Sequence, residues 1–223
     1  MATPYATNQF SPHCLDLTDI RPIGMGNRRH VFAHPQHPDL CIKVARSAHI
    51  RAQLDAKGGL YRFMGTHRRD DNWLEAQAYQ QKALQAPPEA RVWQYVPRLY
   101  GWQETSQGPG LVFDYYRDET GGPAPSLETA LKAEGLSPRL ETALESLRGY
   151  IGETDLTMRH PGPPNIVLAT DGDLKLIDCL GTYNTDFSRY IPALRRKRLA
   201  RHTHYLDVAV GRILTARKTA EPS

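Results

Sequence analysis

Asn165 and Asp178 are the residues of this chain whose types and spacing point most directly to chemistry. Each lies at an end of a short apolar run in the stretch PPNIVLATDGDLKLIDCLG. The two runs predict β-strands joined by a turn at Asp171-Gly172-Asp173, which brings the amide and the carboxylate to the same end of a hairpin. Magnesium takes oxygen ligands and needs few of them from the protein when phosphates supply the rest. The pattern therefore indicates a cation site that holds nucleotide phosphates.

A second group of chemically suggestive residues precedes this hairpin. Gly24 and Gly26 lie in the stretch IGMGNRRHVF, Lys43 in the apolar stretch CIKV, and Glu75 in a helical stretch. Glycines allow unusual backbone angles or a close approach of backbone N–H groups to phosphate oxygens. A strand lysine can neutralise phosphate charge, and a glutamate on a packed helix can hold that lysine extended. Each residue also has an ordinary structural interpretation, but their order and spacing together favour a phosphate site.

The elements that must position these residues are short strands and turns in the first half of the chain. Residues 19–35 predict a hairpin, residues 39–46 a strand, and residues 72–85 a helix that stops before two prolines. Two further strands are expected in VPRLYGWQET and GLVFDYY. Residues 47–71 are rich in charge and contain a Gly-Gly pair, so we expect them to be more mobile than their flanks.

The second half is expected to be mostly helical around the polar hairpin. Ser126 can cap one helix. A second helix is predicted in SPRLETALESLRGYIGE, where Leu140, Leu144, Leu147 and Ile151 lie on one stripe. The loop RDETGGPAP separates the two halves and is the expected boundary between them.

Taken as a set, these residues resemble the protein-kinase-like fold. More narrowly, the chain resembles the YrbL family, the PhoP regulatory network proteins of bacteria, in HVFAHPQHPDLCIKV, VPRLYGWQET, LTMRHPGPPNIVL and IDCLG. The resemblance implies ATP and Mg²⁺ as cofactors. By that resemblance, the cofactor-binding residues would be Gly24, Gly26, Lys43 and Glu75, and the metal ligands would be Asn165 and Asp178.

The resemblance also implies a fold class and a domain organisation. The fold would be α+β, bilobal and protein-kinase-like, with an antiparallel-sheet N-lobe that carries one main helix and a short, mostly helical C-lobe. The expected parts are an N-terminal extension over 1–20, the N-lobe over 21–116, the reduced C-lobe over 117–216 and a flexible tail over 217–223.

Three departures from the kinase pattern bear on activity. Typical kinases have an aspartate five residues before the catalytic-loop asparagine, and His160 stands at that position here. The glycine after Asp178 comes one place late, at Gly181, and Arg29 stands where the third glycine of the Gly-rich loop belongs. His160 can act as a base in place of the carboxylate, or it can be a structural histidine in a loop that does no chemistry.

Two function classes follow from these observations, and a third, weaker one makes the basic helix described below primary and the protein a nucleic-acid or anionic-surface binder. The leading hypothesis is an ATP- and magnesium-binding protein, either an atypical phosphotransferase with a protein or small-molecule acceptor or a nucleotide-dependent regulator. The alternative is a non-catalytic pseudokinase that acts as a protein-binding module. The two differ in whether His160 contributes to turnover.

The basic charge is concentrated in one segment. The chain has 28 basic and 24 acidic residues, for a net charge of +4, and the run RRKRLAR from Arg195 to Arg201 contains five of the cations. Such a run is usually a solvated helix face, although it can contact an acidic partner, an anionic lipid surface or nucleic acid. The chain has no helix-turn-helix signature or RNP-like aromatic motif, which counts against nucleic acid.

The remaining composition indicates a cytoplasmic protein. No apolar run approaches the roughly 20 residues of a membrane span, and the N-terminus lacks the basic start and apolar core of a signal peptide. Cys14, Cys41 and Cys179 have no metal-ligand spacing and suit a reducing compartment. Cys41 and Cys179 lie in predicted strands, where we expect small buried side chains.

Overall fold

The structure is a computed structural model that describes residues 13–26, 28–46, 71–159, 161–181 and 191–220. The chain forms two compact units. Unit 1 comprises the residues up to Tyr79 together with Arg98–Tyr115, and unit 2 comprises Gln80–Pro97 and the chain from Tyr116 onward. The mobility expected for residues 47–71 concerns a segment of which 47–70 lie outside the described residues.

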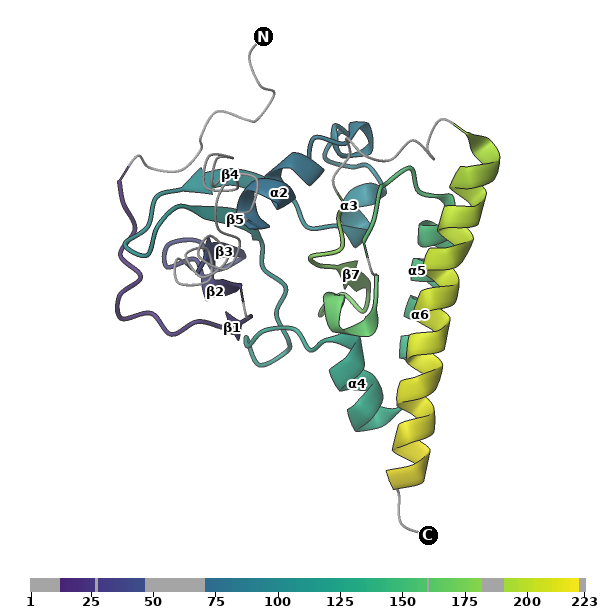
Figure 1. Ribbon diagram of the computed structural model, residues 1–223. Coiled ribbons are helices and arrows are strands. Elements are labelled where there is room, and N and C mark those ends of the chain that lie inside the picture. Colours follow the sequence, from purple (N-terminus) through teal and green to yellow (C-terminus); the bar gives the residue numbers. More distant parts are fainter. Residues whose placement is uncertain (1–12, 27, 47–70, 160, 182–190, 221–223) are drawn as a thin grey trace, which may run out of the picture. The chain divides into compact units, whose positions relative to one another are not determined.

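Unit 1 is built on an antiparallel sheet in the order β1-β2-β3-β5-β4 (Figure 1). The strands are β1 Gly24–Met25, β2 Arg29–Ala33, β3 Leu40–Ala45, β4 Leu99–Gln103 and β5 Gly110–Asp114. Side chains alternate between the faces of a strand, so Phe32, Ile42 and Val112 share one face and form the core of this unit. Lys43 and Phe113 lie on the other face.

Helix α2, Asp71–Ala78, packs against β3 and β5. The helix was expected to run over residues 72–85, and that prediction is wrong at its C-terminal end. Gln81 instead has an extended backbone, with φ −60° and ψ 137°, and a short 3-10 helix, η3 Lys82–Leu84, follows it. The Gln81 side chain hydrogen-bonds the backbone of Thr157 and Gly181, so tertiary hydrogen bonds override the local helix propensity.

Residues 13–20 belong to the body of unit 1, although an N-terminal extension was expected over residues 1–20. The Leu15 N–H donates to the Glu104 carbonyl at 2.9 Å, and the Ser106 N–H donates to the Leu15 carbonyl at 2.8 Å. The side chains of Leu15 and Leu17 are buried in the same core as Phe32. This segment is therefore an added edge of the sheet domain, held by hydrophobic burial as well as by backbone hydrogen bonds.

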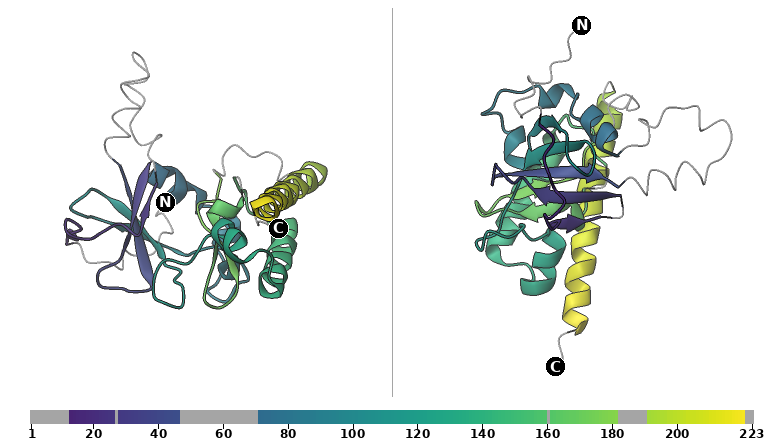
Figure 2. Two further views of the ribbon diagram at one scale, coloured as in Figure 1. Left: turned by 90° about the horizontal axis from the view of Figure 1, so that it is seen from below. Right: turned by 90° about the vertical axis from the view of Figure 1, so that its left-hand side faces the viewer.

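Unit 2 consists of helices around a small hairpin. Its elements after η3 are α3 Val92–Tyr95, α4 Leu127–Glu134, α5 Pro138–Glu153, η4 Pro163–Asn165, β6 Ile166–Leu168, β7 Leu174–Leu176 and α6 Pro192–Ala220. The hydroxyl of Ser126 accepts the Thr129 N–H at 3.1 Å, which confirms the predicted cap of α4. Both α4 and α5 pack against the long helix α6, and Figure 2 shows α5 and α6 side by side.

The buried stripe of α5 is also confirmed, because its four members are at most 1% exposed: Leu140, Leu144, Leu147 and Ile151. Ser137 caps this helix, accepting the Leu140 N–H, and Pro138 occupies its first turn. The long apolar stripe fixes which face of α5 points into the core of unit 2.

Two of the expected domain boundaries differ from the compact units. Residues 80–97 were assigned to the first lobe but belong to unit 2, where the ring of Tyr95 stacks on that of Tyr150 at 4.2 Å. Residues 217–220 were expected in a flexible tail but continue α6, and residues 221–223 lie outside the described part of the chain.

Candidate functional site

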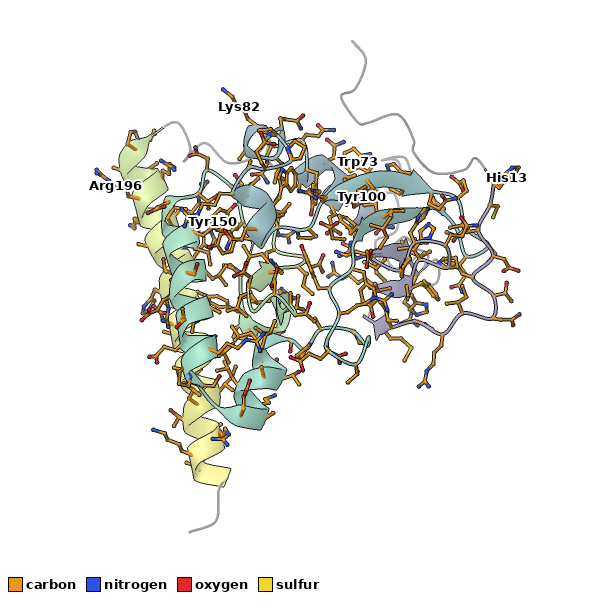
Figure 3. All side chains as sticks on the ribbon, turned by 180° about the vertical axis from the view of Figure 1, so that it is seen from behind. His13, Trp73, Lys82, Tyr100, Tyr150 and Arg196 are labelled. Carbon is orange, nitrogen blue, oxygen red and sulfur yellow. The ribbon has the colours of Figure 1, made fainter. Side chains whose placement is uncertain are left out.

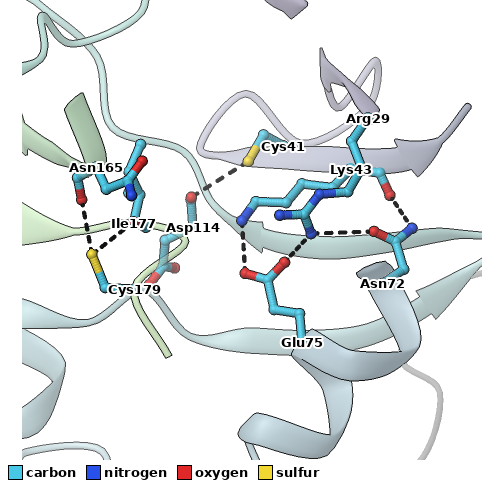
Figure 4. Close-up of polar contacts among 9 residues, drawn as sticks. All are labelled: Arg29, Cys41, Lys43, Asn72, Glu75, Asp114, Asn165, Ile177 and Cys179. Carbon is cyan, nitrogen blue, oxygen red and sulfur yellow. Dashed lines mark hydrogen bonds and ion pairs between the residues drawn. The ribbon is translucent and has the colours of Figure 1, made fainter. Parts of the chain in front are cut away.

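Lys43 and Glu75 form an ion pair in unit 1. The Lys43 Nζ atom lies 2.7 Å from Glu75 Oε1, and the two side chains are only 11% and 9% exposed (Figure 4). The Lys43 ammonium also lies 4.5 Å from the centre of the Phe113 ring, a cation–π contact on the same face of the sheet. Strand β3 therefore presents the lysine and helix α2 presents the carboxylate that orients it, as the order of these residues predicted.

Arg29 and Asn72 complete this network, although the sequence predicts neither as a site residue. Arg29 Nη1 forms an ion pair with Glu75 Oε2 and also donates to Asn72 Oδ1 at 3.4 Å. The fully buried Asn72 donates from Nδ2 to the Lys43 carbonyl at 2.8 Å, so α2 is tied to β3 through side chain and backbone (Figure 4). The signal was the strand periodicity, which places Arg29 on the same face as Lys43.

Gly24 and Gly26 serve the turn of the β1–β2 hairpin. The Gly26 N–H donates to the Arg29 carbonyl at 2.9 Å, and a Cβ at Gly26 would lie 3.3 Å from that oxygen. Gly24 pairs with Val31, and a Cβ there would make an ordinary contact at 3.6 Å. Neither glycine has a φ in the left-handed region, so of the two roles expected for them, unusual backbone angles or close approach, the structure shows the close approach at Gly26. The close approach at Gly26 is made by the hairpin's own backbone.

Asn165 and Asp178 lie at the same end of the β6–β7 hairpin in unit 2. The strands pair with Ile166 opposite Leu176, and the Ile177 N–H donates to the Asn165 carbonyl at 2.8 Å. Asn165 precedes β6 and Asp178 follows Ile177, which confirms the predicted hairpin and the placement of its amide and carboxylate residues. The predicted turn residue Gly172 has a φ of 89°.

Asp178 has an unusual backbone conformation. Its φ is 56°, and among the described residues it alone has a positive φ without being glycine. Aspartate tolerates this region better than most residues, and such conformations cluster at functional sites where the surroundings hold them in place. The neighbouring Cys179 provides that support, because its buried thiol donates to the carbonyls of Asn165 at 3.3 Å and Ile177 at 3.1 Å (Figure 4).

The other end of the hairpin is a structural turn. Asp171 Oδ1 accepts the Asp173 N–H at 2.9 Å, and Asp171 Oδ2 lies 2.7 Å from the ammonium of the buried Lys175. Asp173 also contacts Lys175 and accepts a hydrogen bond from Gln94 at 3.1 Å. These two carboxylates stabilise the turn and neutralise the buried Lys175 ammonium. Asp173 is therefore a turn residue, as expected.

The hairpin end carries two candidate cation ligands, Asn165 and Asp178. No group of three or more His, Cys, Asp or Glu residues suited to a metal occurs within the described ranges. Asn165 and Asp178 can offer an amide oxygen and a carboxylate, which are ligands suited to magnesium. Phosphate and water oxygens would have to supply the remaining ligands.

His160, the candidate catalytic residue, lies outside the described residues. The residues beside it are well connected: the Arg159 N–H donates to the Cys179 carbonyl at 2.6 Å, and the Gly181 N–H donates to the Thr157 carbonyl at 2.9 Å. A Cβ at Gly181 would lie 3.0 Å from the Arg159 side chain and 3.2 Å from that of Thr157. The displaced glycine therefore has a packing reason, because two chain segments cross closely at this position.

The cations in the basic segment of α6 differ in their surroundings: some contact other parts of unit 2 and others are exposed to solvent. Arg195 lies 2.6 Å from Asp155 Oδ1 and donates to the Glu153 carbonyl at 3.0 Å, next to the C-terminus of α5. Arg198 is buried, and that burial lowers the pKa of its guanidinium. The expectation of a solvated helix face is thus wrong for Arg198. The exposed cations are Arg196, Lys197 and Arg201, and Figure 3 shows Arg196 at the outer edge of its helix.

Cys41 and Cys179 are both buried, as expected, at 6% and 1% exposure, whereas Cys14 is exposed. Burial raises the pKa of the Cys41 thiol to about 12, so this side chain is a weakly reactive part of the strand. Across the described part of the chain, we find no helix that combines the length and the apolar character needed to cross a bilayer.

The fold and site define an α+β protein in which an antiparallel sheet carries a buried lysine–glutamate pair and a helical unit carries a polar hairpin. The family model of the PhoP regulatory network protein YrbL matches residues 15–207. The chain therefore belongs to the YrbL family.

Similar proteins include YrbL of Escherichia coli (strain K12) and YrbL of Shigella flexneri. Each is 24% identical to this chain over 155 residues, which is 68% of this chain. The match spans 64% of the length of these curated relatives.

Proposed function

We propose that this protein binds ATP together with magnesium, on a fold of the protein-kinase-like type. The observation that carries the proposal is the Lys43–Glu75 pair. The Lys43 side chain is largely removed from solvent, and its ammonium lies 2.7 Å from the Glu75 carboxylate, which a packed helix presents. A lysine fixed in this way is suited to neutralise phosphate charge without a large loss of side-chain freedom on binding.

The hairpin of unit 2 supports the metal part of the proposal. Asp178 is exposed and has a φ of 56°, a conformation that costs free energy and directs its side chain differently from an ordinary strand residue. Asn165 lies at the same hairpin end. An amide and a carboxylate with phosphate oxygens form a ligand set suited to magnesium.

The kinase-like assignment is supported by the order of elements in each unit. Unit 1 has a glycine-bearing hairpin, a strand with Lys43 and a helix with Glu75, and unit 2 has the short helix η4 ending at Asn165 and a strand followed by Asp178. The lysine–glutamate pair lies in unit 1, and Asn165 and Asp178 lie in unit 2. The binding experiments test whether one nucleotide uses both sets of residues.

Thermal unfolding of the whole chain, with ATP and magnesium added separately and together, tests this function. A ligand at 100 times its Kd that binds only the folded protein should raise Tm by about 5–10 °C for a chain of this size. We expect the increase with ATP and magnesium together to exceed that with either alone. No increase at millimolar ATP and magnesium would contradict the proposal.

A second question is whether the bound nucleotide is turned over. We propose a nucleotide-dependent regulator without turnover, because His160 and the displaced Gly181 are separate departures from the kinase pattern. ATP consumption by the purified protein that is absent in Asp178→Ala would favour a phosphotransferase instead. If His160 is then the base, His160→Ala should lower turnover by roughly 10²–10⁴-fold with almost unchanged ATP affinity.

A regulatory role also leaves room for a protein partner. The exposed cations Arg196, Lys197 and Arg201 lie near the start of α6 and suit an acidic partner surface. We keep a cytoplasmic location as part of the proposal, since three free cysteines suit a reducing compartment.

A further inference from the structure

The Glu75 carboxylate holds two cations rather than one. Lys43 pairs with Oε1 and Arg29 pairs with Oε2. The three side chains are 11%, 12% and 9% exposed for Lys43, Arg29 and Glu75 respectively. Burying a second cation is costly and is seldom seen without a purpose, so Arg29 requires an explanation beyond the orientation of Lys43.

Arg29 is placed beside Lys43 by the register of two strands. Arg29 pairs with Ala45, and Val31 pairs with Lys43. Residues two apart on a strand share a face, so Arg29 and Lys43 are diagonal neighbours on one face of the sheet. Asn72 accepts from Arg29 and donates to the Lys43 carbonyl, which fixes both strands against α2.

Three backbone N–H groups at described positions in and beside this hairpin already have partners. The Gly26 N–H donates to the Arg29 carbonyl, the Ile23 N–H to the Val31 carbonyl, and the Arg46 N–H to the Arg28 carbonyl, at 2.8–2.9 Å. These N–H groups are therefore used within the sheet. A glycine-rich loop that binds phosphate depends on such groups being directed at the ligand.

We propose that Arg29 is a phosphate-binding residue, and that its guanidinium and the Lys43 ammonium form a two-cation side-chain site for a di- or triphosphate. The proposal rests on the proposed nucleotide function and specifies how its phosphates are held. Glu75 keeps the two cations side by side, and the phosphate takes charge-assisted hydrogen bonds from both.

The chemistry of the two cations suits this division of roles. A guanidinium presents a planar fork of N–H donors that matches two phosphate oxygens, whereas an ammonium acts as a compact point charge. A site made of two side-chain cations recognises phosphate charge, so its affinity should fall steeply with ionic strength. Recognition by neutral backbone N–H groups would depend less on salt.

Calorimetric titration of the whole chain with inorganic tripolyphosphate, without magnesium, tests the site apart from the nucleotide. We expect Arg29→Gln to weaken tripolyphosphate binding by about 10–100-fold, the range for loss of a hydrogen bond to a charged group. Arg28→Gln is the matched control, because it removes the same charge from the adjacent residue, whose side chain is 60% exposed and pairs with Asp71. This control should bind nearly as tightly as the parent.

Arg29→Lys separates loss of phosphate binding from loss of folding. This variant keeps a cation paired with Glu75 but lacks the planar set of guanidinium N–H donors. We expect it to stay folded and to bind tripolyphosphate with an affinity between those of the parent and Arg29→Gln. Equal affinity of all three proteins would overturn the proposal, as would an equal loss in Arg28→Gln.

A parallel titration with ATP and magnesium separates this proposal from the proposed function. Tripolyphosphate binding that depends on Arg29, without binding of ATP and magnesium, would support the two-cation site and contradict the nucleotide function. Binding of ATP and magnesium that is unaffected in Arg29→Gln would support the nucleotide function and contradict the two-cation site. If the parent binds neither compound, both proposals are wrong.

Discussion

The Lys43 ammonium lies 2.7 Å from the Glu75 carboxylate, and each side chain is about nine-tenths removed from solvent. A pair in this environment is very different from a surface salt bridge. Removing one partner leaves a charge without its compensation, which costs far more than the attraction lost between two solvated ions.

Replacing Glu75 by Gln should therefore lower the free energy of unfolding by about 3–5 kcal/mol, because two buried cations lose their shared carboxylate. Urea denaturation measures this difference. Glu128→Gln is a suitable control, since Glu128 forms an ion pair with Lys132 one helical turn away at 2.5 Å on the exposed face of α4. The control should lose less than about 1 kcal/mol. Equal losses in the two variants would show that the network around Glu75 is effectively solvated.

The connection after α2 should depend on Gln81. Its side chain accepts the Thr157 N–H at 2.6 Å and donates to the carbonyls of Thr157 and Gly181 at 3.2 and 3.3 Å, all in a buried environment. Gln81→Ala should cost about 1–3 kcal/mol in denaturant unfolding, since these backbone groups lose their partner. The exposed neighbour Gln80 provides a matched control, and Gln80→Ala should change stability by less than about 0.5 kcal/mol. A Gln81→Ala protein as stable as the Gln80→Ala protein would refute this role.

Stability between pH 6.5 and pH 4 should depend on His34. Burial, and secondarily the nearby His37, lowers the pKa of His34 from 6.5 to about 4. Its Nδ1 accepts the N–H groups of Gln36 and His37, both at 3.2 Å, and a protonated Nδ1 cannot accept them. In this pH window the unfolded chain binds the proton more readily, so the free energy of unfolding should fall as the pH falls.

The variant His34→Asn tests that sign, because its amide oxygen can accept the same two N–H groups without titrating. Unfolding measured from pH 7 to pH 4 should show a smaller loss of stability in His34→Asn than in the parent. His204→Asn, at an exposed position of α6, is the control and should follow the parent. An unchanged pH profile in His34→Asn would mean that other groups govern acid stability.

Local patterns in the sequence were sufficient to predict several elements. The stripe of α5 and the Ser126 cap of α4 are short-range features whose physical causes lie within one or two helical turns. The β6–β7 hairpin, with Asn165 and Asp178 at one end, was predictable because two apolar runs flank a strong turn signal. The pairing of Lys43 with Glu75 followed from their placement on adjacent elements.

Features decided by long-range contacts were not predictable in the same way. Helix α2 ends early because Gln81 bonds segments 76 and 100 residues further along the chain. Residues 13–20 join the sheet domain through hydrogen bonds to Glu104 and Ser106. The sequence shows Arg29 only as the residue in place of the third glycine of the Gly-rich loop, because its contact with Glu75 depends on strand register and on the packing of α2.

The magnesium dependence of ATP affinity tests the central claim most directly. Asp178→Asn removes the carboxylate charge at one end of the β6–β7 hairpin, and Asp173→Asn removes the same charge from the turn at its other end. Calorimetry on the parent should show ATP binding that magnesium tightens at least about tenfold, a difference of about 1.4 kcal/mol. Asp178→Asn should abolish that magnesium effect, and Asp173→Asn should retain it. An ATP affinity that is undetectable in the parent, or a magnesium effect that survives in Asp178→Asn, would contradict the account.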